Sequence, residues 1–128
     1  MTGTVEFSQT SDFANTTVVV KLDGLAGAAA GWHVHEYSVQ SGSCALTCGH
    51  LNPGNVTAAE TTASGRKEAG DLAKKDISLS GKLTYSSTFT DPQNDPLYVS
   101  DVIGRSIVIH FANATRWSVC ISVPFVYE

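Results

Sequence analysis

Three of the four histidines in this 128-residue chain lie close together in the sequence. His33 and His35 belong to the stretch GWHVHEY, and His50 follows in a segment rich in glycine and cysteine. Neutral imidazole is a good ligand for copper, zinc, iron and nickel. The HVH spacing therefore predicts a metal site, for which His50 and His110 are further candidate ligands. Two solvent-exposed surface histidines are the alternative interpretation of HVH.

The elements that would position these histidines have the pattern of β-strands. Apolar and polar residues alternate in GTVEFSQ and GWHVHEY, and TTVVVKLDGL is rich in β-branched residues. On a strand, side chains at i and i+2 point to the same face, so His33 and His35 should lie side by side. The expected strands span residues 3–9, 16–25, 31–37, 77–89, 103–111 and 117–127.

The remaining segments have the composition of loops and turns. Residues 49–75 predict a long loop, in which the only plausible helical turn lies near residues 58–63 or 70–75. The stretch TDPQNDP has turn chemistry. Many short strands separated by turns predict one all-β domain over residues 1–128, an antiparallel sandwich or barrel.

Composition narrows the choice of partners and of cellular location. The net charge is −4 and the basic residues are scattered, which argues against nucleic acid or an anionic membrane as partner. No apolar run approaches the roughly 20 residues that span a bilayer. Three cysteines and three N-x-S/T triplets, at Asn15, Asn55 and Asn113, fit an extracellular glycoprotein.

Five motifs together resemble the copper/zinc superoxide dismutase family. In order along the chain they are GWHVHEY, C-x5-HLNP, GDL, IGRSIVIH and a late cysteine. The resemblance covers nearly the whole chain and begins one strand after the usual first strand of the family. It implies a Greek-key antiparallel β-barrel or sandwich, immunoglobulin-like and of the superoxide dismutase type. Such a fold has about seven or eight strands and long loops that build the metal site.

The same resemblance assigns candidate site residues. The four copper ligands of the family have counterparts in His33, His35, His50 and His110. Cys44 and Cys120 match the intrasubunit disulfide of the family. Arg116 resembles the arginine beside the copper, although it precedes Cys120 by four residues where the family usually has three. A solvated surface arginine is the alternative.

Two departures from the family pattern indicate its copper-only branch, which implies one copper and no zinc. Where zinc enzymes have His-x-x-Asp, this chain has Glu68-Ala-Gly-Asp71, and no histidine remains for a second metal. We expect Glu68 to accept a hydrogen bond from His50 in place of zinc, and Asp71 to brace the loop. A charged, solvated loop tip is the alternative. Only FANAT separates His110 from Arg116, so the copper should be relatively open.

The resemblance predicts a superoxide dismutase that converts superoxide to dioxygen and hydrogen peroxide. Arg116 would attract the anion, His50 would leave the copper on reduction, and Glu68 would steady His50. The competing interpretations are a non-catalytic copper-binding module for storage, delivery or extracellular structure, and a β-barrel spacer. Neighbouring repeat domains of a longer chain are a further implied partner. Cys48 is expected to be a small buried residue, a free thiol or an intermolecular link.

Overall fold

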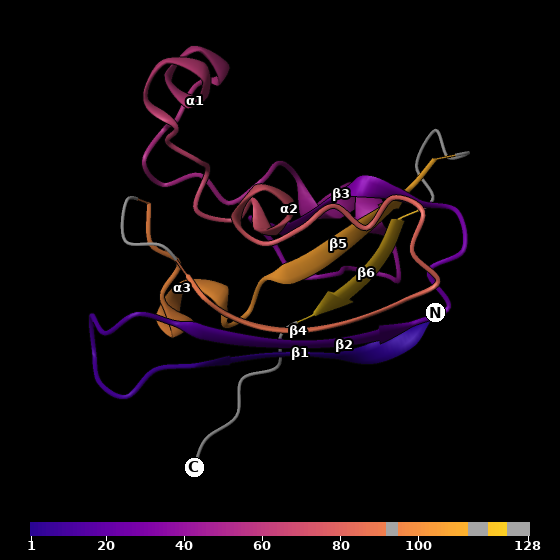
Figure 1. The fold of residues 1–128 in the computed structure, drawn as a ribbon. Coiled ribbons are helices and arrows are strands. Elements are labelled where there is room, and N and C mark those ends of the chain that lie inside the picture. The colour runs from indigo at the N-terminus through magenta and orange to yellow at the C-terminus, as the bar shows by residue number, and fades with distance from the viewer. Residues whose placement is uncertain (92–94, 113–117, 123–128) are drawn as a thin grey trace.

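Two antiparallel sheets form the framework of the computed structural model, which describes residues 1–91, 95–112 and 118–122, the last group by backbone alone. The first sheet has the strand order β1-β2-β4 and contains β1 (Thr2–Ser8), β2 (Thr17–Asp23) and β4 (Thr84–Thr90). The second has the order β3-β5-β6 and contains β3 (Ala28–His35), β5 (Ser106–Phe111) and β6 (Ser118–Ser122). Figure 1 shows them as two layers.

The core lies between these layers and is built by the alternation visible in the sequence. Val18, Val20 and Leu22 of β2 are buried, and Trp32 and Val34 of β3 are fully buried in the same cluster. Burial of each large apolar side chain contributes roughly 1.5–3 kcal/mol. Because Trp32 and Val34 point into the core, His33 and His35 must point to the other face of β3.

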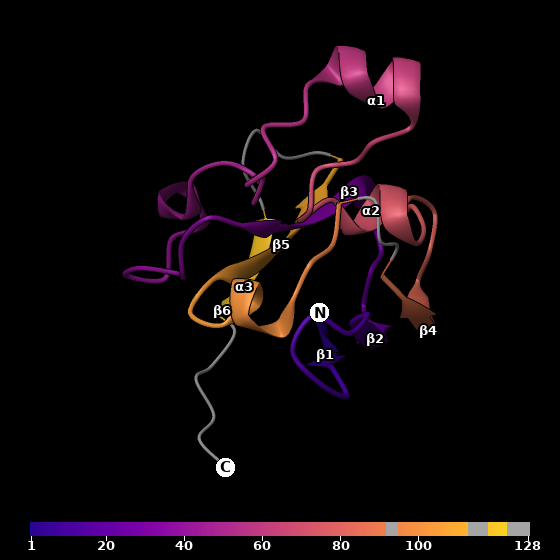
Figure 2. The same cartoon turned by 90° about the vertical axis from the view of Figure 1, so that its left-hand side faces the viewer.

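Short helices occupy the connections. They are the 3-10 turn η1 (Cys44–Thr47) and the helices α1 (Ala58–Ser64), α2 (Leu72–Lys75) and α3 (Val99–Val102). A capping box of Thr57 and Glu60 begins α1, which ends at Gly65 in the left-handed conformation. No side chain of α1 is buried, and the helix projects away from both sheets (Figures 1 and 2). No helix within the described residues is long and apolar enough to cross a membrane.

The antiparallel, mostly β architecture is confirmed, but of the expected barrel or sandwich with about seven or eight strands, the described residues show neither a closed barrel nor that number of strands. The described residues form six strands in two separate sheets. The expected strand 77–89 begins only at Thr84, because the residues before it turn at Gly81 (φ 75°). Leu79 is nevertheless buried, and the carbonyl of Ile77 accepts the indole N–H of Trp32. The apolar signal there came from core packing rather than from strand pairing.

The loops also differ from expectation. The sequence predicted one helical turn, near residues 58–63 or 70–75, and both segments are helical. No pattern in the sequence indicated η1 or α3. Of the expected strand 117–127, residues 118–122 form β6, and the others lie outside the described residues.

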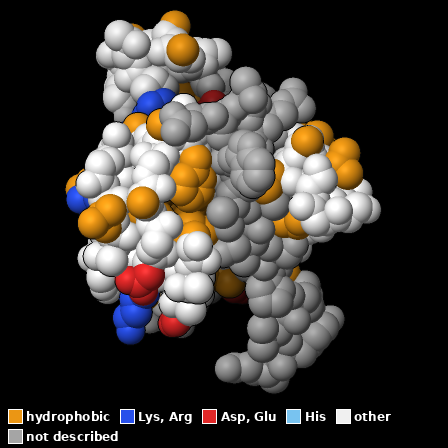
Figure 3. All heavy atoms as spheres, turned by 90° about the vertical axis from the view of Figure 1, so that its right-hand side faces the viewer, with side chains coloured by type: hydrophobic (Ala, Val, Ile, Leu, Met, Phe, Trp, Pro, Cys, Tyr) orange, Lys and Arg blue, Asp and Glu red, His pale blue; other side chains and the backbone are white. Residues whose placement is uncertain are grey.

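Among the described residues, few charged side chains are visible on one face of the molecule (Figure 3). Figure 3 shows hydrophobic side chains of the described residues in separate groups among polar atoms, with charged side chains at only a few places.

Candidate metal centre

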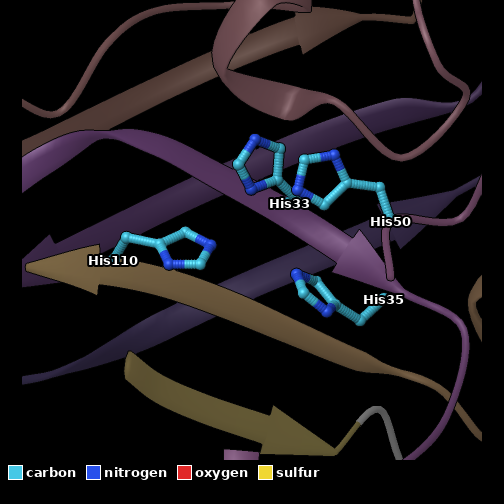
Figure 4. A group of neighbouring side chains, drawn as sticks. All are labelled: His33, His35, His50 and His110. Carbon is cyan, nitrogen blue, oxygen red and sulfur yellow. The ribbon is translucent and has the colours of Figure 1, made fainter. Parts of the chain in front are cut away.

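The structure brings the four histidines together. One nitrogen of each ring can be chosen so that all four lie within 4.8 Å of one another. His33 and His35 come from β3, His110 comes from β5, and His50 comes from the loop before α1. Figure 4 shows the four rings gathered around a common space. Residues 2 to 77 positions apart thus converge, as a shared metal ion requires.

His50 reaches the cluster because its loop is paired with the end of β3. The backbones of His35 and His50 form an antiparallel bridge. On either side of it, the Leu51 N–H donates to the Val34 carbonyl at 2.8 Å and the Glu36 N–H donates to the Gly49 carbonyl at 3.0 Å. These backbone bonds place His50 beside the strand histidines although it is not in a regular strand.

The proton of His35 is fixed by the turn that precedes His50. His35 Nδ1 lies 2.9 Å from the Cys48 carbonyl and 3.2 Å from Thr47 Oγ1. The Thr47 hydroxyl itself donates to the Cys44 carbonyl, so towards His35 it can only accept. Nδ1 must therefore carry the hydrogen, which leaves the lone pair on Nε2. That Nε2 is buried and has no hydrogen-bond partner.

His33 also presents a buried nitrogen without a partner, in this case Nδ1. Its other nitrogen, Nε2, faces Asp71 Oδ1 at 3.6 Å. The His33 ring stacks on the His50 ring, with centroids 3.7 Å apart. Asp71 is buried, caps α2 through the Lys74 N–H, and forms an ion pair with the Lys74 ammonium at 2.9 Å. Asp71 therefore both braces the loop and lies behind His33.

Glu68 holds the outer nitrogen of His50. The distance between Glu68 Oε2 and His50 Nδ1 is 2.5 Å, and both side chains are partly buried. An ionised carboxylate only accepts hydrogen bonds, so this contact places a hydrogen on Nδ1 and directs the Nε2 lone pair away from Glu68.

Burial keeps three of these imidazoles neutral. It lowers the pKa of His33 to about 3, with a further contribution from the neighbouring His50. Burial is also the largest cause that lowers the pKa of His35 and of His110. Removal of a cationic ring from water is unfavourable, and so is a second cation beside it. Neutral rings keep the lone pairs that a metal ion needs.

The donor set fits copper. Buried polar atoms are normally hydrogen-bonded, so the unpartnered nitrogens of His33 and His35 need an explanation. A metal ion among the four rings would satisfy both nitrogens. Imidazole nitrogen suits copper, and the carboxylates lie against outer nitrogens, as the partners of metal-bound histidines do.

Several predicted residues lie outside the described part of the chain. They include Arg116 and Asn113, and the side chain of Cys120. Cys44 is disulfide-bonded, while Cys48 is an exposed free cysteine. The exposure of Cys48 excludes the buried small residue, and the free thiol and the intermolecular link stay as the two interpretations. The pairing of Cys44 with Cys120 stays a prediction.

Sequence reasoning missed the residues that act through backbone or shape. The Thr47 hydroxyl and the Cys48 carbonyl at His35 carry no sequence signal. Gly31 is the third such residue, because a Cβ there would lie 2.7 Å from His33 Cε1. A glycine two residues before the first histidine was the one available hint.

Comparisons with known proteins agree with this geometry. The sequence model of the copper/zinc superoxide dismutase family matches residues 1–115. A superoxide dismutase [Cu-Zn] of Drosophila tolteca is 32% identical over 108 residues, which cover 84% of this chain and 92% of that protein. Its counterpart in Schizosaccharomyces pombe is 32% identical over 111 residues, covering 86% and 70%.

A solved structure shows the same similarity in three dimensions. Superoxide dismutase 5 of Candida albicans, in a Cu(II) form, superposes with a TM-score of 0.69 and 30% sequence identity. The match covers 97% of this chain and 82% of that one. Fold, sequence and a four-histidine cluster of the copper-binding type agree, and the chain belongs to the copper/zinc superoxide dismutase family.

Proposed function

We propose that the protein is a copper-only superoxide dismutase, which disproportionates superoxide at one copper and binds no zinc. The observation that carries this proposal is the contact of Glu68 Oε2 with His50 Nδ1. A zinc ion shared through His50 would need that nitrogen, and a carboxylate of the chain already occupies it. All four histidines of the sequence belong to the one cluster, so no imidazole remains for a second metal.

The names of the similar proteins are compatible with either metal content. The two relatives cited above are named for copper and zinc, whereas the Candida albicans structure is named for Cu(II) alone. The copper-only assignment is therefore argued from the residues of this chain. Asp71 supports it, because its carboxylate is committed to the cap of α2 and to the Lys74 ammonium.

In this proposal, bound copper supplies one-electron chemistry, oxidising one superoxide to dioxygen and reducing a second to hydrogen peroxide. The chain prepares the ligands. Cys48 and Thr47 fix the hydrogen of His35 on Nδ1, and Glu68 fixes that of His50 on Nδ1. β3 holds the rings of His33 and His35 rigidly. His50 lies on a loop and is the histidine best placed to move, with Glu68 to hold its ring.

Arg116 has the proposed role of attracting superoxide. Guanidinium stays charged at all relevant pH values and steers anions over a distance. Arg116→Ala should slow dismutation, flatten its dependence on salt and leave copper bound. An unchanged rate and salt dependence would show that Arg116 is only a solvated surface residue, and Lys21→Ala serves as the control that removes an exposed cation.

Extracellular location is a further part of the proposal. Cys44 is disulfide-bonded, and disulfides persist in oxidising compartments. Asn55, in the triplet Asn-Val-Thr, is exposed on a turn just before α1. Expression in a secreting eukaryotic host tests the location, and glycosidase treatment of the secreted protein tests whether Asn55 carries a glycan. A protein retained inside the cell would contradict the location.

Metal analysis with activity measurement tests the proposed function directly. Protein incubated with equal copper and zinc should retain about one copper and no stoichiometric zinc, and should dismutate superoxide. A tightly held zinc would overturn the copper-only assignment. One copper with dismutation no faster than that of an unrelated copper-loaded protein would favour the non-catalytic copper module.

Substitution of Glu68 tests the observation itself. Glu68→Ala and Glu68→Gln should weaken copper affinity or activity within the roughly 10–100-fold range for lost partners of metal ligands, with Ala worse. Glu36→Gln is the control, because it removes an exposed carboxylate one residue after His35. Wild-type copper retention and turnover in Glu68→Ala would exclude the role of Glu68.

A further inference from the structure

Glu68 lies between two anchored flanks, and the following residues form the first. Ala69 is buried. The Gly70 N–H donates to the Leu51 carbonyl and the Gly70 carbonyl accepts from the Val34 N–H, each at 2.8 Å. Gly70 is thus joined to the same two segments that carry His33, His35 and His50. These hydrogen bonds fix the backbone directly after Glu68 relative to the segments that carry the histidines.

The preceding flank is held by Asp95, which approaches from a different part of the chain. Asp95 Oδ1 lies 2.6 Å from Arg66 Nη2, and Oδ2 lies 3.3 Å from Arg66 Nε. Oδ2 also accepts from the backbone N–H of Lys67 at 3.4 Å. One carboxylate therefore binds the two residues directly before Glu68. Only 8% of the Asp95 side chain is exposed, and such a two-point contact with arginine is geometrically restrictive.

The backbone of Asp95 is itself held by a lysine whose side chain is buried. The Asp95 carbonyl accepts a hydrogen bond from the Lys75 ammonium at 2.7 Å. The Lys75 side chain is fully buried and its ammonium also contacts Asp91 Oδ1 at 2.8 Å, and the Asp91 carboxylate accepts the Leu97 N–H. A buried charge is immobile when every hydrogen-bond partner is in place. Asp95 therefore connects α2 and the end of β4 with the segment that carries Glu68.

The Glu68 carbonyl also accepts the Asp71 N–H at 3.0 Å, which holds the flank that follows Glu68, but the described residues offer no equally restrictive contact on the preceding flank. α1, directly before the segment, has no buried side chain. The second acidic partner of Arg66 is Glu60 on α1, whose side chain is 44% exposed. Exposed ion pairs contribute little to stability and hold little in place.

We propose that Asp95 is a positioning residue for the metal centre: it holds Arg66 and Lys67 so that the Glu68 carboxylate stays against His50 Nδ1. Asp95 touches neither the histidines nor any substrate and acts only through Glu68. The inference rests on the role proposed above for Glu68. Loss of the Asp95 carboxylate should let residues 66–68 move and should weaken the hold on His50.

A double-mutant cycle distinguishes this role from a general effect on folding. Asp95→Asn keeps the backbone carbonyl that Lys75 binds but removes the carboxylate charge. It is measured alone and together with Glu68→Gln, with copper affinity determined by competition against a chelator. Metal-free samples give unfolding temperatures and the hydrogen exchange of the Lys67 amide. Glu60→Gln is the matched control, because it removes the exposed partner of the same arginine.

We expect Asp95→Asn alone to weaken copper affinity by about 3- to 10-fold, less than the roughly 10–100-fold for a direct partner of a ligand. In the Glu68→Gln background the same substitution should cost no further affinity, since coupled residues are not additive. Exchange of the Lys67 amide should be faster in metal-free Asp95→Asn and unchanged in Glu60→Gln.

Other outcomes overturn the inference in recognisable ways. Equal losses in both backgrounds would show that Asp95 acts on folding rather than through Glu68. A loss in Glu68→Gln with none in Asp95→Asn would remove the role of Asp95 and keep that of Glu68. No loss in Glu68→Gln would refute the proposed role of Glu68 itself.

Discussion

Gly31→Ala should disable copper binding while leaving the fold intact. The backbone of Gly31 is not left-handed, so alanine introduces no conformational strain there. The added Cβ would lie 2.7 Å from His33 Cε1, 3.4 Å from His33 Nε2 and 3.7 Å from His110 Cδ2. Ordinary van der Waals contact begins near 3.4 Å, so the His33 ring must move by about 0.7 Å.

A shift of this size is large for the distance between a metal ion and its ligand, but small for a side chain that packs against other side chains. The ring is packed against His50 with centroids 3.7 Å apart, and its Nε2 faces Asp71. Ligand distances tolerate shifts of only about 0.2 Å. We therefore expect copper affinity to fall by more than the roughly 100-fold upper figure for a lost hydrogen-bond partner of a ligand. The metal-free protein, in which the ring can rotate aside, should lose only about 1 kcal/mol of stability or less.

Three measurements check this expectation. Competition against a chelator gives the affinity, electron paramagnetic resonance gives the number of nitrogen ligands, and denaturant unfolding gives the stability of the metal-free form. Gly49→Ala is the control, because its Cβ would meet no atom within 4 Å although it neighbours His50. Unchanged copper binding in Gly31→Ala, or an equal loss in Gly49→Ala, would refute the reasoning.

Three further predictions concern stability. Lys75→Met leaves the carboxylate of Asp91 buried and unpaired, so denaturant titration should show a loss of about 3–5 kcal/mol, part of which a second change, Asp91→Asn, restores. Burial lowers the pKa of His33 from 6.5 to about 3, so the unfolded chain alone binds that proton between these pH values. The metal-free protein should therefore lose up to about 1.4 kcal/mol per unit as pH falls through this window, and pH-independent unfolding would contradict this. Cys44→Ala should cost about 2–5 kcal/mol and Cys48→Ala far less, as thermal unfolding and peptide mapping can show.

The strands and the pair of His33 and His35 were predictable because both depend on short, regular patterns, whereas His50 and His110 were assigned as ligands by resemblance to the family. Alternation in GWHVHEY places Trp32 in the core and His33 on the opposite face, and the structure confirms it. The segment 77–83 misled the prediction, because Leu79 is apolar for the core and not for a sheet. Helices of four residues, such as α3, are too short to show a helical period.

The expected contact of Glu68 with His50 is present, but the residues that hold Glu68 in place could not be predicted. Asp95 occurs in a stretch whose proline and aspartate composition indicates only a turn. Its role depends on Lys75, which reaches it across 20 positions from a helix that the sequence barely indicated. Contacts between loops arise from the tertiary fold, so no local pattern records them.

The four histidines alone do not make this centre a metal site, because an imidazole can present either nitrogen. Contacts with the loops determine which nitrogen carries the hydrogen and which one presents its lone pair. The turn at Cys48 places the hydrogen of His35 on Nδ1, and Glu68 does the same for His50. Burial on β3 keeps the ring of His33 neutral, with its unpartnered Nδ1 enclosed. Since lone pairs rather than rings bind copper, the non-histidine residues determine whether the strands carry a metal centre or only a group of buried aromatic side chains.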